Sequence, residues 1–180
     1  MTRSNSLALI FVLEAMFLII SIEARHSITF PQKLSNTGMI IDICNDAPYN
    51  FDHCLSVLLQ SNPSADIWGL VVFFVDDMEE KAKDALAKIN ALQRARSGYN
   101  AALDSCRKNY NTILVADIPK AREALKKRDT KISEGPLNDA FNKVQKCETD
   151  FPRQLTPQNN LMRDDVGDTI YMFKLTHGHA

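Results

Sequence analysis

Residues 64–96 read SADIWGLVVFFVDDMEEKAKDALAKINALQRAR, and this stretch decides the fold. Its apolar side chains recur at intervals of three and four residues, which places them on one face of an α-helix. These side chains are Ile67, Val71, Phe74, Met78, Ala82, Ala85, Ile89 and Leu92. Ser64 or Asp66 is placed to cap the N-terminus of the helix. We therefore predict one long amphipathic helix whose apolar face packs against partner helices.

Three later stretches repeat this spacing: one between the break at Ser97-Gly98 and the cations at residues 126–128, one at residues 135–152, and one at residues 156–173. Pro119 is expected to kink the first, because proline removes a backbone donor and crowds the preceding turn. Thr156 and Pro157 suit the N-cap and the first helical position of the last. The apolar positions are Leu103, Cys106, Tyr110 and Ile113; Leu137, Phe141, Val144, Cys147 and Phe151; and Met162, Val166, Ile170 and Phe173.

Two shorter segments precede the long helix. Residues 40–44 and 49–60 flank a turn at 45–48 that contains Pro48, a pattern typical of a small helical hairpin. We find no useful stretch with the period of two that β-strands show. The sequence thus predicts an all-α fold, an antiparallel four-helix bundle with an N-terminal helical hairpin, within one domain at residues 25–180.

The N-terminus carries a targeting signal. Residues 7–22 are apolar except for Glu14 and Ser21, Arg3 precedes them, and Ala24 is a small residue suited to cleavage. This pattern predicts a secretory signal peptide at residues 1–24. A transmembrane anchor is the alternative, but 16 residues interrupted by an acid fall short of the roughly 20 apolar residues that span a bilayer.

Composition narrows the possible partners. The chain has 21 Lys and Arg against 22 Asp and Glu, a net charge of −1. Binding to nucleic acid needs a surplus of cations gathered on one face, so we expect no nucleic-acid partner. Once the signal peptide is removed, we expect no membrane association either.

Four cysteines remain in the predicted secreted domain. An even number outside the cytosol indicates disulfides, and three pairings are possible. Cys44 and Cys54 lie on either side of the hairpin turn, while Cys106 and Cys147 occupy inward positions on consecutive helices. We therefore predict two disulfides, Cys44–Cys54 and Cys106–Cys147. No Cys-x-x-Cys pattern exists, and the two histidines at positions 177 and 179 are interpreted as part of the C-terminal tail, so no metal site is expected.

The sequence offers no catalytic constellation. No histidine lies between residues 55 and 176, so the bundle cannot build a Ser-His or Cys-His pair. No glycine-rich phosphate loop is present, and no cofactor is expected. The acidic run at residues 76–80 continues into Lys81 and Lys83, which favours a solvated face of mixed charge. We interpret the chain as a binding protein and not an enzyme.

The cysteine regions resemble the plant invertase/pectin methylesterase inhibitor family. Residues 40–44 (IIDIC) and 51–58 (FDHCLSVL) are similar to its hairpin pattern, with Phe51 in place of the family's tyrosine. Residues 102–110 (ALDSCRKNY) match its Ala-Leu-x-x-Cys-x-x-x-Tyr pattern, and residues 147–151 (CETDF) match the region of its fourth cysteine. The resemblance implies the same fold and the same disulfide pairing.

The resemblance also implies a function. Family members are secreted or vacuolar proteins that inhibit acid invertase or pectin methylesterase by a stoichiometric complex covering the active site. Invertase inhibitors present Gly-Asp followed by Pro-Lys-Phe between two helices, and the matching residues here are Asp129, Thr130, Lys131 and Ile132. These four are the predicted contacts with the target enzyme. The change from proline to Thr130 removes preorganisation and leaves the choice of target open.

We therefore expect a secreted inhibitor in the extracellular space or cell wall, or in the vacuole. Two other binding functions remain open for a helical bundle of this kind: a carrier of a small apolar ligand, and a secreted signal recognised by a receptor. His53, which lies within the predicted hairpin, is a candidate for tuning binding in acidic fluid.

Overall fold

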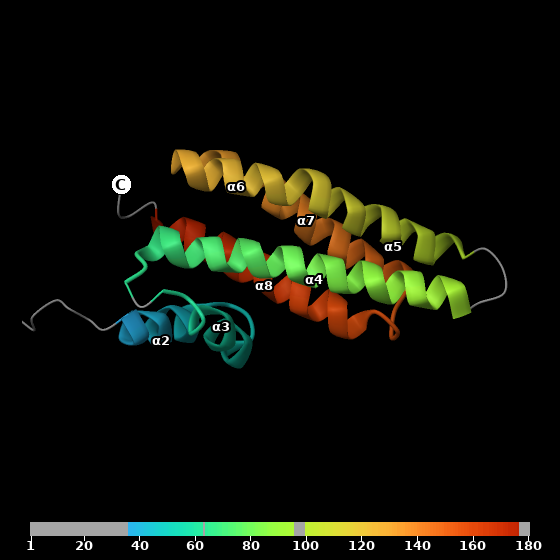
Figure 1. Cartoon of the computed structure of the whole chain (residues 1–180), viewed down its shortest axis with the longest axis horizontal. Coiled ribbons are helices and arrows are strands. Elements are labelled where there is room, and N and C mark those ends of the chain that lie inside the picture. Colours follow the sequence, from blue (N-terminus) through green and yellow to red (C-terminus); the bar gives the residue numbers. More distant parts are fainter. Residues whose placement is uncertain (1–35, 63, 96–99, 177–180) are drawn as a thin grey trace, which may run out of the picture. The chain divides into compact units, whose positions relative to one another are not determined.

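The computed structural model describes the backbone of residues 36–62, 64–95 and 100–176, and their side chains except at positions 36 and 130–133. The predicted signal peptide, residues 1–24, lies outside this part of the chain. Every regular element of the described residues is helical, and none of them forms a strand (Figure 1). Across the same residues, no helix is long and apolar enough to cross a membrane.

The hairpin comes first and the bundle follows. The hairpin consists of α2 (Asn36–Asp46) and α3 (Phe51–Leu58). The bundle elements are α4 (Ile67–Ala95), α5 (Ala101–Thr112), the π-helical segment η1 (Ile113–Asp117), α6 (Ile118–Lys127), α7 (Thr130–Asp150) and α8 (Thr156–Thr176). Figure 1 shows α5, η1 and α6 following one line, so that they act as one bundle member. Successive members run antiparallel, which confirms the predicted bundle with its N-terminal hairpin.

The core forms where α4 packs on α8 and on α5, with α7 closing the other side. The predicted stripe of α4 faces this core, and six of its eight positions, from Val71 to Ile89, are buried. Ile67 and Leu92, at the two ends of the stripe, are partly buried. Burial of each large apolar side chain contributes roughly 1.5–3 kcal/mol, so this stripe supplies much of the driving force for folding.

Short polar side chains start three of the helices. Asp66 Oδ1 accepts a hydrogen bond from the backbone N–H of Gly69 at 2.9 Å, so Asp66 caps α4 as one of the two predicted residues. Asn50 caps α3 and Asn100 caps α5 in the same way. Each such cap satisfies a backbone N–H that has no partner within the helix.

The chain accommodates Pro119 through η1. The backbone N–H of Ile118 bonds the carbonyl of Ile113, five residues back, which inserts an extra residue into the helix just before the proline. Single π-helical turns of this kind are a known cause of kinks in α-helices. The insertion lies next to Asp117, which is buried and accepts a hydrogen bond from Lys143 of α7 at 2.8 Å.

The helix predicted at residues 135–152 begins earlier than expected. Helix α7 starts at Thr130 and contains Pro136 within it. A proline inside a helix removes one backbone hydrogen bond. Packing of α7 along α8 and α6 holds the helix across that gap. The prediction placed the start of the helix near Gly135 and Pro136, and this boundary was wrong by five residues.

Two disulfides fasten the fold, in the predicted pairs. Cys44–Cys54 joins α2 to α3, and Cys106–Cys147 joins α5 to α7. Bridges of this kind stabilise a domain by about 2–4 kcal/mol each, largely by restricting the unfolded chain.

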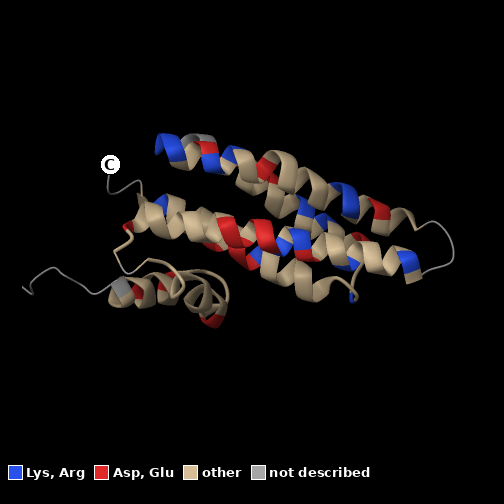
Figure 2. Ribbon diagram, viewed as in Figure 1, with Lys and Arg blue, Asp and Glu red and all other residues tan. Residues whose placement is uncertain are grey.

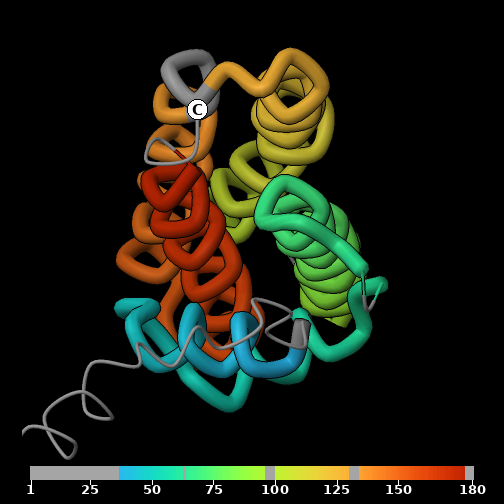
Figure 3. Tube along the Cα trace, turned by 90° about the vertical axis from the view of Figure 1, so that its left-hand side faces the viewer, coloured from blue at the N-terminus to red at the C-terminus, as the bar shows by residue number. Residues whose placement is uncertain are grey.

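The hairpin packs against one side of the bundle, where α3 contacts α4 and α8 (Figure 3). Tyr49, just before α3, lies on Gly167 of α8. A Cβ atom at position 167 would approach the Tyr49 ring to 1.9 Å, so only glycine fits there. Tyr49 also makes a tilted ring contact with Phe141 of α7, at 6.4 Å between centroids. These contacts fix the hairpin over α8.

Candidate functional site

The first candidate site is the corner between α6 and α7. Helix α6 ends in a Schellman motif, in which Asp129 N–H bonds the carbonyl of Ala124 and Arg128 N–H bonds that of Leu125. Arg128 is left-handed, with φ 51°, at a position that usually favours glycine. A non-glycine residue there is strained by roughly 1–2 kcal/mol. The corner is thus short and sharply turned.

The predicted contact residues lie at this corner. Asp129 lies between the two helices and is half-buried. Thr130, Lys131 and Ile132 belong to the first turn of α7, although the sequence was interpreted as an interhelical loop at this point. The positions of these three side chains lie outside the described residues. The backbone therefore places the four residues together at the start of a helix.

Arg128 and Trp68, which the sequence analysis did not assign to a site, also belong to this corner. The guanidinium of Arg128 lies 5.7 Å from the ring centroid of Trp68. Its Nη2 lies 3.5 Å from Oδ2 of Asp66, at the beginning of α4. Trp68 itself packs edge-on against Phe173, with 6.2 Å between the ring centroids. Trp68, Val72 and Leu125 also line a surface groove of about 340 Å³ beside Arg128.

The corner has a cationic surface next to an acidic one. Lys126, Lys127 and Arg128 end α6, whereas the acidic run of α4 lies further along the bundle, as Figure 2 shows. Arg122 joins the two, because its guanidinium pairs with Asp76 at 2.7 Å and also with Glu79. The corner is therefore anchored to α4 by ion pairs as well as by apolar contacts.

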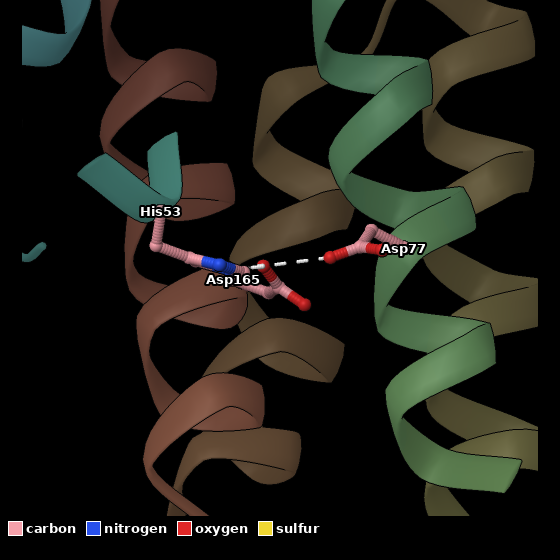
Figure 4. A group of neighbouring side chains, drawn as sticks. All are labelled: His53, Asp77 and Asp165. Carbon is pink, nitrogen blue, oxygen red and sulfur yellow. Dashed lines mark hydrogen bonds and ion pairs between the residues drawn. The ribbon is translucent and has the colours of Figure 1, made fainter. Parts of the chain in front are cut away.

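The second candidate site is a buried polar cluster under the hairpin. His53 of α3, Asp77 of α4 and Asp165 of α8 point toward one another (Figure 4). His53 Nε2 is in hydrogen-bond contact with Oδ1 of Asp165 and lies 3.9 Å from Oδ2 of Asp77. The side chain of Asp165 is 0% exposed, that of His53 10% and that of Asp77 21%. A third acid of α8, Asp168, is buried close by.

Burial changes the protonation of this cluster. Removal from water disfavours a charged carboxylate and raises the pKa of Asp165 to about 7. The same cause raises the pKa of Asp168 to about 7. The hydrogen bond to Asp165 raises the pKa of His53. Near neutral pH, protonated and ionised forms of Asp165 and Asp168 therefore coexist.

Sequence reasoning missed this cluster for two reasons. The acidic run of α4 was interpreted as a solvated face, yet only Asp76 and Glu80 are exposed while Asp77 and Glu79 are half-buried. The acids of α8 were not weighed at all. A signal was present, because Asp165 follows Met162 by three positions and shares its inward face.

The fold defines a class of protein: a helical bundle with an N-terminal hairpin and one disulfide in each part. The chain belongs to the plant invertase/pectin methylesterase inhibitor family, whose model matches residues 38–176. The match covers the hairpin and all four bundle members.

One relative and two solved structures illustrate the likeness. The chain is 36% identical over 121 residues to cell wall / vacuolar inhibitor of fructosidase 1 of Arabidopsis thaliana, a match that covers 66% of this chain and 58% of that protein. It is similar to a mutant form of a pectin methylesterase inhibitor from Arabidopsis, with TM-score 0.64, 17% identity, and 78% of this chain and 97% of the other covered.

A second structure, of a pectin methylesterase inhibitor from Arabidopsis thaliana, gives TM-score 0.56 and 18% identity, with 76% of this chain and 95% of the other covered. At these identities the structural likeness concerns the fold alone.

Proposed function

We propose that this protein is a secreted inhibitor of a plant cell-wall or vacuolar carbohydrate enzyme and acts by forming a stoichiometric complex. The observation that carries this proposal is the family match, which spans the hairpin and the bundle from residue 38 to 176. Binding is the function that the family description supports, because it names inhibitors. The partner is the target enzyme itself.

An acid invertase is the favoured target. Invertase is a fructosidase, and the relative at 36% identity carries the name of an inhibitor of fructosidase. Pectin methylesterase is the second target, suggested by the names of the solved structures. The identity of those structures, 17–18%, supports a shared fold and weighs less on the choice of target.

The proposed contact surface is the corner of α6 and α7, with Asp129, Thr130, Lys131 and Ile132 as contacts. Glycoside hydrolases act through a pair of carboxylates, so a cation offered at the active-site cleft gains charge-assisted hydrogen bonds. Arg128, held between Trp68 and Asp66, lies beside these residues and adds a second cation. The short, strained turn presents the start of α7 in a defined position, which lowers the entropy lost on binding.

The proposed route to the target begins with the signal peptide at residues 1–24. Removal of this segment yields the domain at residues 25–180, whose disulfides suit an oxidising compartment. The name of the Arabidopsis relative supports the cell wall or the vacuole as the destination.

Titration of two enzymes tests this proposal. An acid invertase and a pectin methylesterase, each at fixed concentration, receive increasing amounts of the oxidised protein from residue 25 onward. We expect the activity of one enzyme to fall to a plateau near an equimolar ratio. Full activity of both enzymes, across several isoforms and from acidic to neutral pH, would reject inhibition and favour carriage of a small apolar ligand or signalling.

A further inference from the structure

We propose that His53, Asp77 and Asp165 form a binding site for a divalent transition-metal ion of the Zn²⁺ class. The inference goes beyond the proposed inhibition and does not depend on which enzyme is bound. It rests on three ligand atoms from three separate elements, which lie within 4.8 Å of one another under the hairpin (Figure 4).

The spacing of the donor atoms suits such an ion. Zinc binds imidazole nitrogen and carboxylate oxygen at about 2.0–2.2 Å, which sets neighbouring tetrahedral ligands roughly 3.5 Å apart. One donor atom lies closer to His53 Nε2 than this ligand spacing and one lies farther away. His53 Nε2 is in hydrogen-bond contact with Asp165 Oδ1 and lies 3.9 Å from Asp77 Oδ2.

A second observation points to a ligand at this place. The side chain of Asp165 is fully buried, and its Oδ2 has no hydrogen-bond partner within the described chain. Oδ2 of Asp77 is likewise without a hydrogen bond among the described groups. Two facing carboxylates in a dry site repel each other unless a shared proton or a cation lies between them. A cation would offer both of these oxygens, neither of which has a hydrogen bond in the described part of the chain, a partner at once.

The surroundings provide orientation and a route from solvent. Lys81 donates to Oδ1 of Asp77 at 3.2 Å, which leaves Oδ2 turned to His53. Asp77 also lines a surface groove of about 310 Å³, in which the carboxylates of Asp76, Glu79 and Glu80 outnumber the one cation, Arg122. An acidic groove raises the local concentration of cations at its mouth.

The donor set selects the class of ion. One imidazole with two carboxylates suits Zn²⁺ and its neighbours in the first transition row, whereas Mg²⁺ and Ca²⁺ prefer oxygen ligands throughout. The chain also has histidines at positions 26, 177 and 179, whose imidazoles are potential metal ligands of their own. The sequence analysis expected no metal site, because it sought closely spaced ligands and these three lie far apart in the sequence.

A bound ion would join α3 of the hairpin to α4 and α8. The hairpin is otherwise fixed by Tyr49 on Gly167 and by apolar contacts. Metal binding would therefore increase the thermal stability of the hairpin's attachment, since a ligand that binds only the folded state stabilises it.

Calorimetric titration with Zn²⁺ tests the site. The oxidised protein from residue 25 onward carries the background changes His26→Gln, His177→Gln and His179→Gln, so that only His53 remains. We expect one ion per chain, a Zn²⁺-dependent rise of the melting temperature, and no displacement by excess Mg²⁺. Asp77→Asn should weaken Zn²⁺ binding at least tenfold, while Asp76→Asn, which alters the neighbouring acid of the same groove, should change it less than twofold.

His53→Gln and the ring-proton NMR signals of His53 give independent readouts. We expect Zn²⁺ to shift these signals in the background protein but not in the Asp77→Asn variant, which alters the most exposed side chain of the cluster. Absence of Zn²⁺ binding in the folded background protein would overturn the site and leave a shared proton between the carboxyl groups. Equal loss in Asp76→Asn and Asp77→Asn would overturn it too, since it would indicate general attraction by the groove.

Discussion

The junction of α5, α7 and α8 and the cluster under the hairpin both bury polar side chains, with opposite results. At the junction, Tyr110 donates to Asn159 Oδ1 at 2.8 Å, and Asn159 donates to Glu148 Oε2 at 2.6 Å. Thr156 donates to the second oxygen of Glu148 at 2.5 Å. Each partner in this chain is satisfied, and Glu148 is half-buried.

Under the hairpin, buried acids outnumber their partners. Asp165 bonds His53 through one oxygen only, and neither oxygen of Asp168 has a hydrogen bond among the described residues. A buried polar group without a partner costs about 1–3 kcal/mol, and a charged one costs more. The satisfied junction therefore stabilises the fold. The cluster instead carries an unfavourable electrostatic free energy, which binding of protons or cations reduces.

The largest effect on this comparison should come from the disulfides. Removal of Cys106–Cys147, which closes the junction across 41 residues, should lower the free energy of unfolding by about 4 kcal/mol. Removal of Cys44–Cys54, which spans 10 residues in the hairpin, should lower it by about 3 kcal/mol, because a shorter loop restricts the unfolded chain less. Urea unfolding of the two paired Cys→Ala variants measures both values, and a larger loss for the hairpin bridge would contradict the order.

A substitution under the hairpin comes next. Gly167→Ala should displace the Tyr49 ring and lower stability by about 1–3 kcal/mol, with faster amide exchange in α2 and α3 than in α5 and α7. Gly135→Ala is the matched control, because a Cβ atom there meets nothing within 4 Å and alanine favours a helix. Equal exchange rates in the hairpin of both variants would show that Tyr49 does not hold it.

At the junction, removal of a single hydroxyl group should already lower the stability of the fold. Tyr110→Phe removes one hydroxyl, leaves Asn159 Oδ1 without its donor and should cost about 1–2 kcal/mol. The hydroxyl is buried, so water does not readily take its place after the substitution. The same burial raises the pKa of the Tyr110 phenol. Thermal and urea unfolding measure the loss, and a neutral effect would show that the junction contributes packing alone.

The smallest predicted effect is a gain in folding stability, whereas the substitutions above lower it. Asp168→Asn should stabilise the protein at pH 7 by about 1 kcal/mol, because the folded pKa near 7 exceeds the value of about 3.9 expected for an unfolded chain. A raised folded pKa gives stability that is fully present below pH 4 and is lost as pH rises toward 7. His53 and Asp164 act on this pKa in opposite directions.

Unfolding in urea at several pH values separates this contribution. The parent protein should lose more stability than Asp168→Asn between pH 4 and pH 7, and the two profiles should run parallel above that range. Parallel profiles throughout would show that Asp168 titrates normally in the folded protein.

Much of the fold could be predicted because it depends on local patterns. The stripe from Ile67 to Leu92 predicted α4 from spacing alone, and Asp66 was one of the two residues proposed for its cap. The disulfides followed from the positions of the cysteines on predicted elements. The early start of α7 could not be predicted, since the Schellman turn at Arg128 uses a residue other than glycine.

The candidate sites were only partly predictable. The resemblance located Asp129 to Ile132, but the contact of Arg128 with Trp68 depends on how α4 and α6 pack. The cluster was missed because rules for single residues place aspartate at the surface, where it is usually found. Its geometry arises only when the hairpin brings His53 over Asp165, 112 residues away in the sequence.

The most direct test of the proposed inhibition compares two lysines in one assay. Inhibition constants against an acid invertase are measured for the oxidised protein, for Lys131→Ala at the start of α7, and for Lys108→Ala, an exposed lysine of α5. The proposed contact surface predicts that Lys131→Ala weakens inhibition about tenfold, or 1.4 kcal/mol, and that Lys108→Ala leaves it unchanged. Equal inhibition by all three proteins would contradict a role for the corner of α6 and α7.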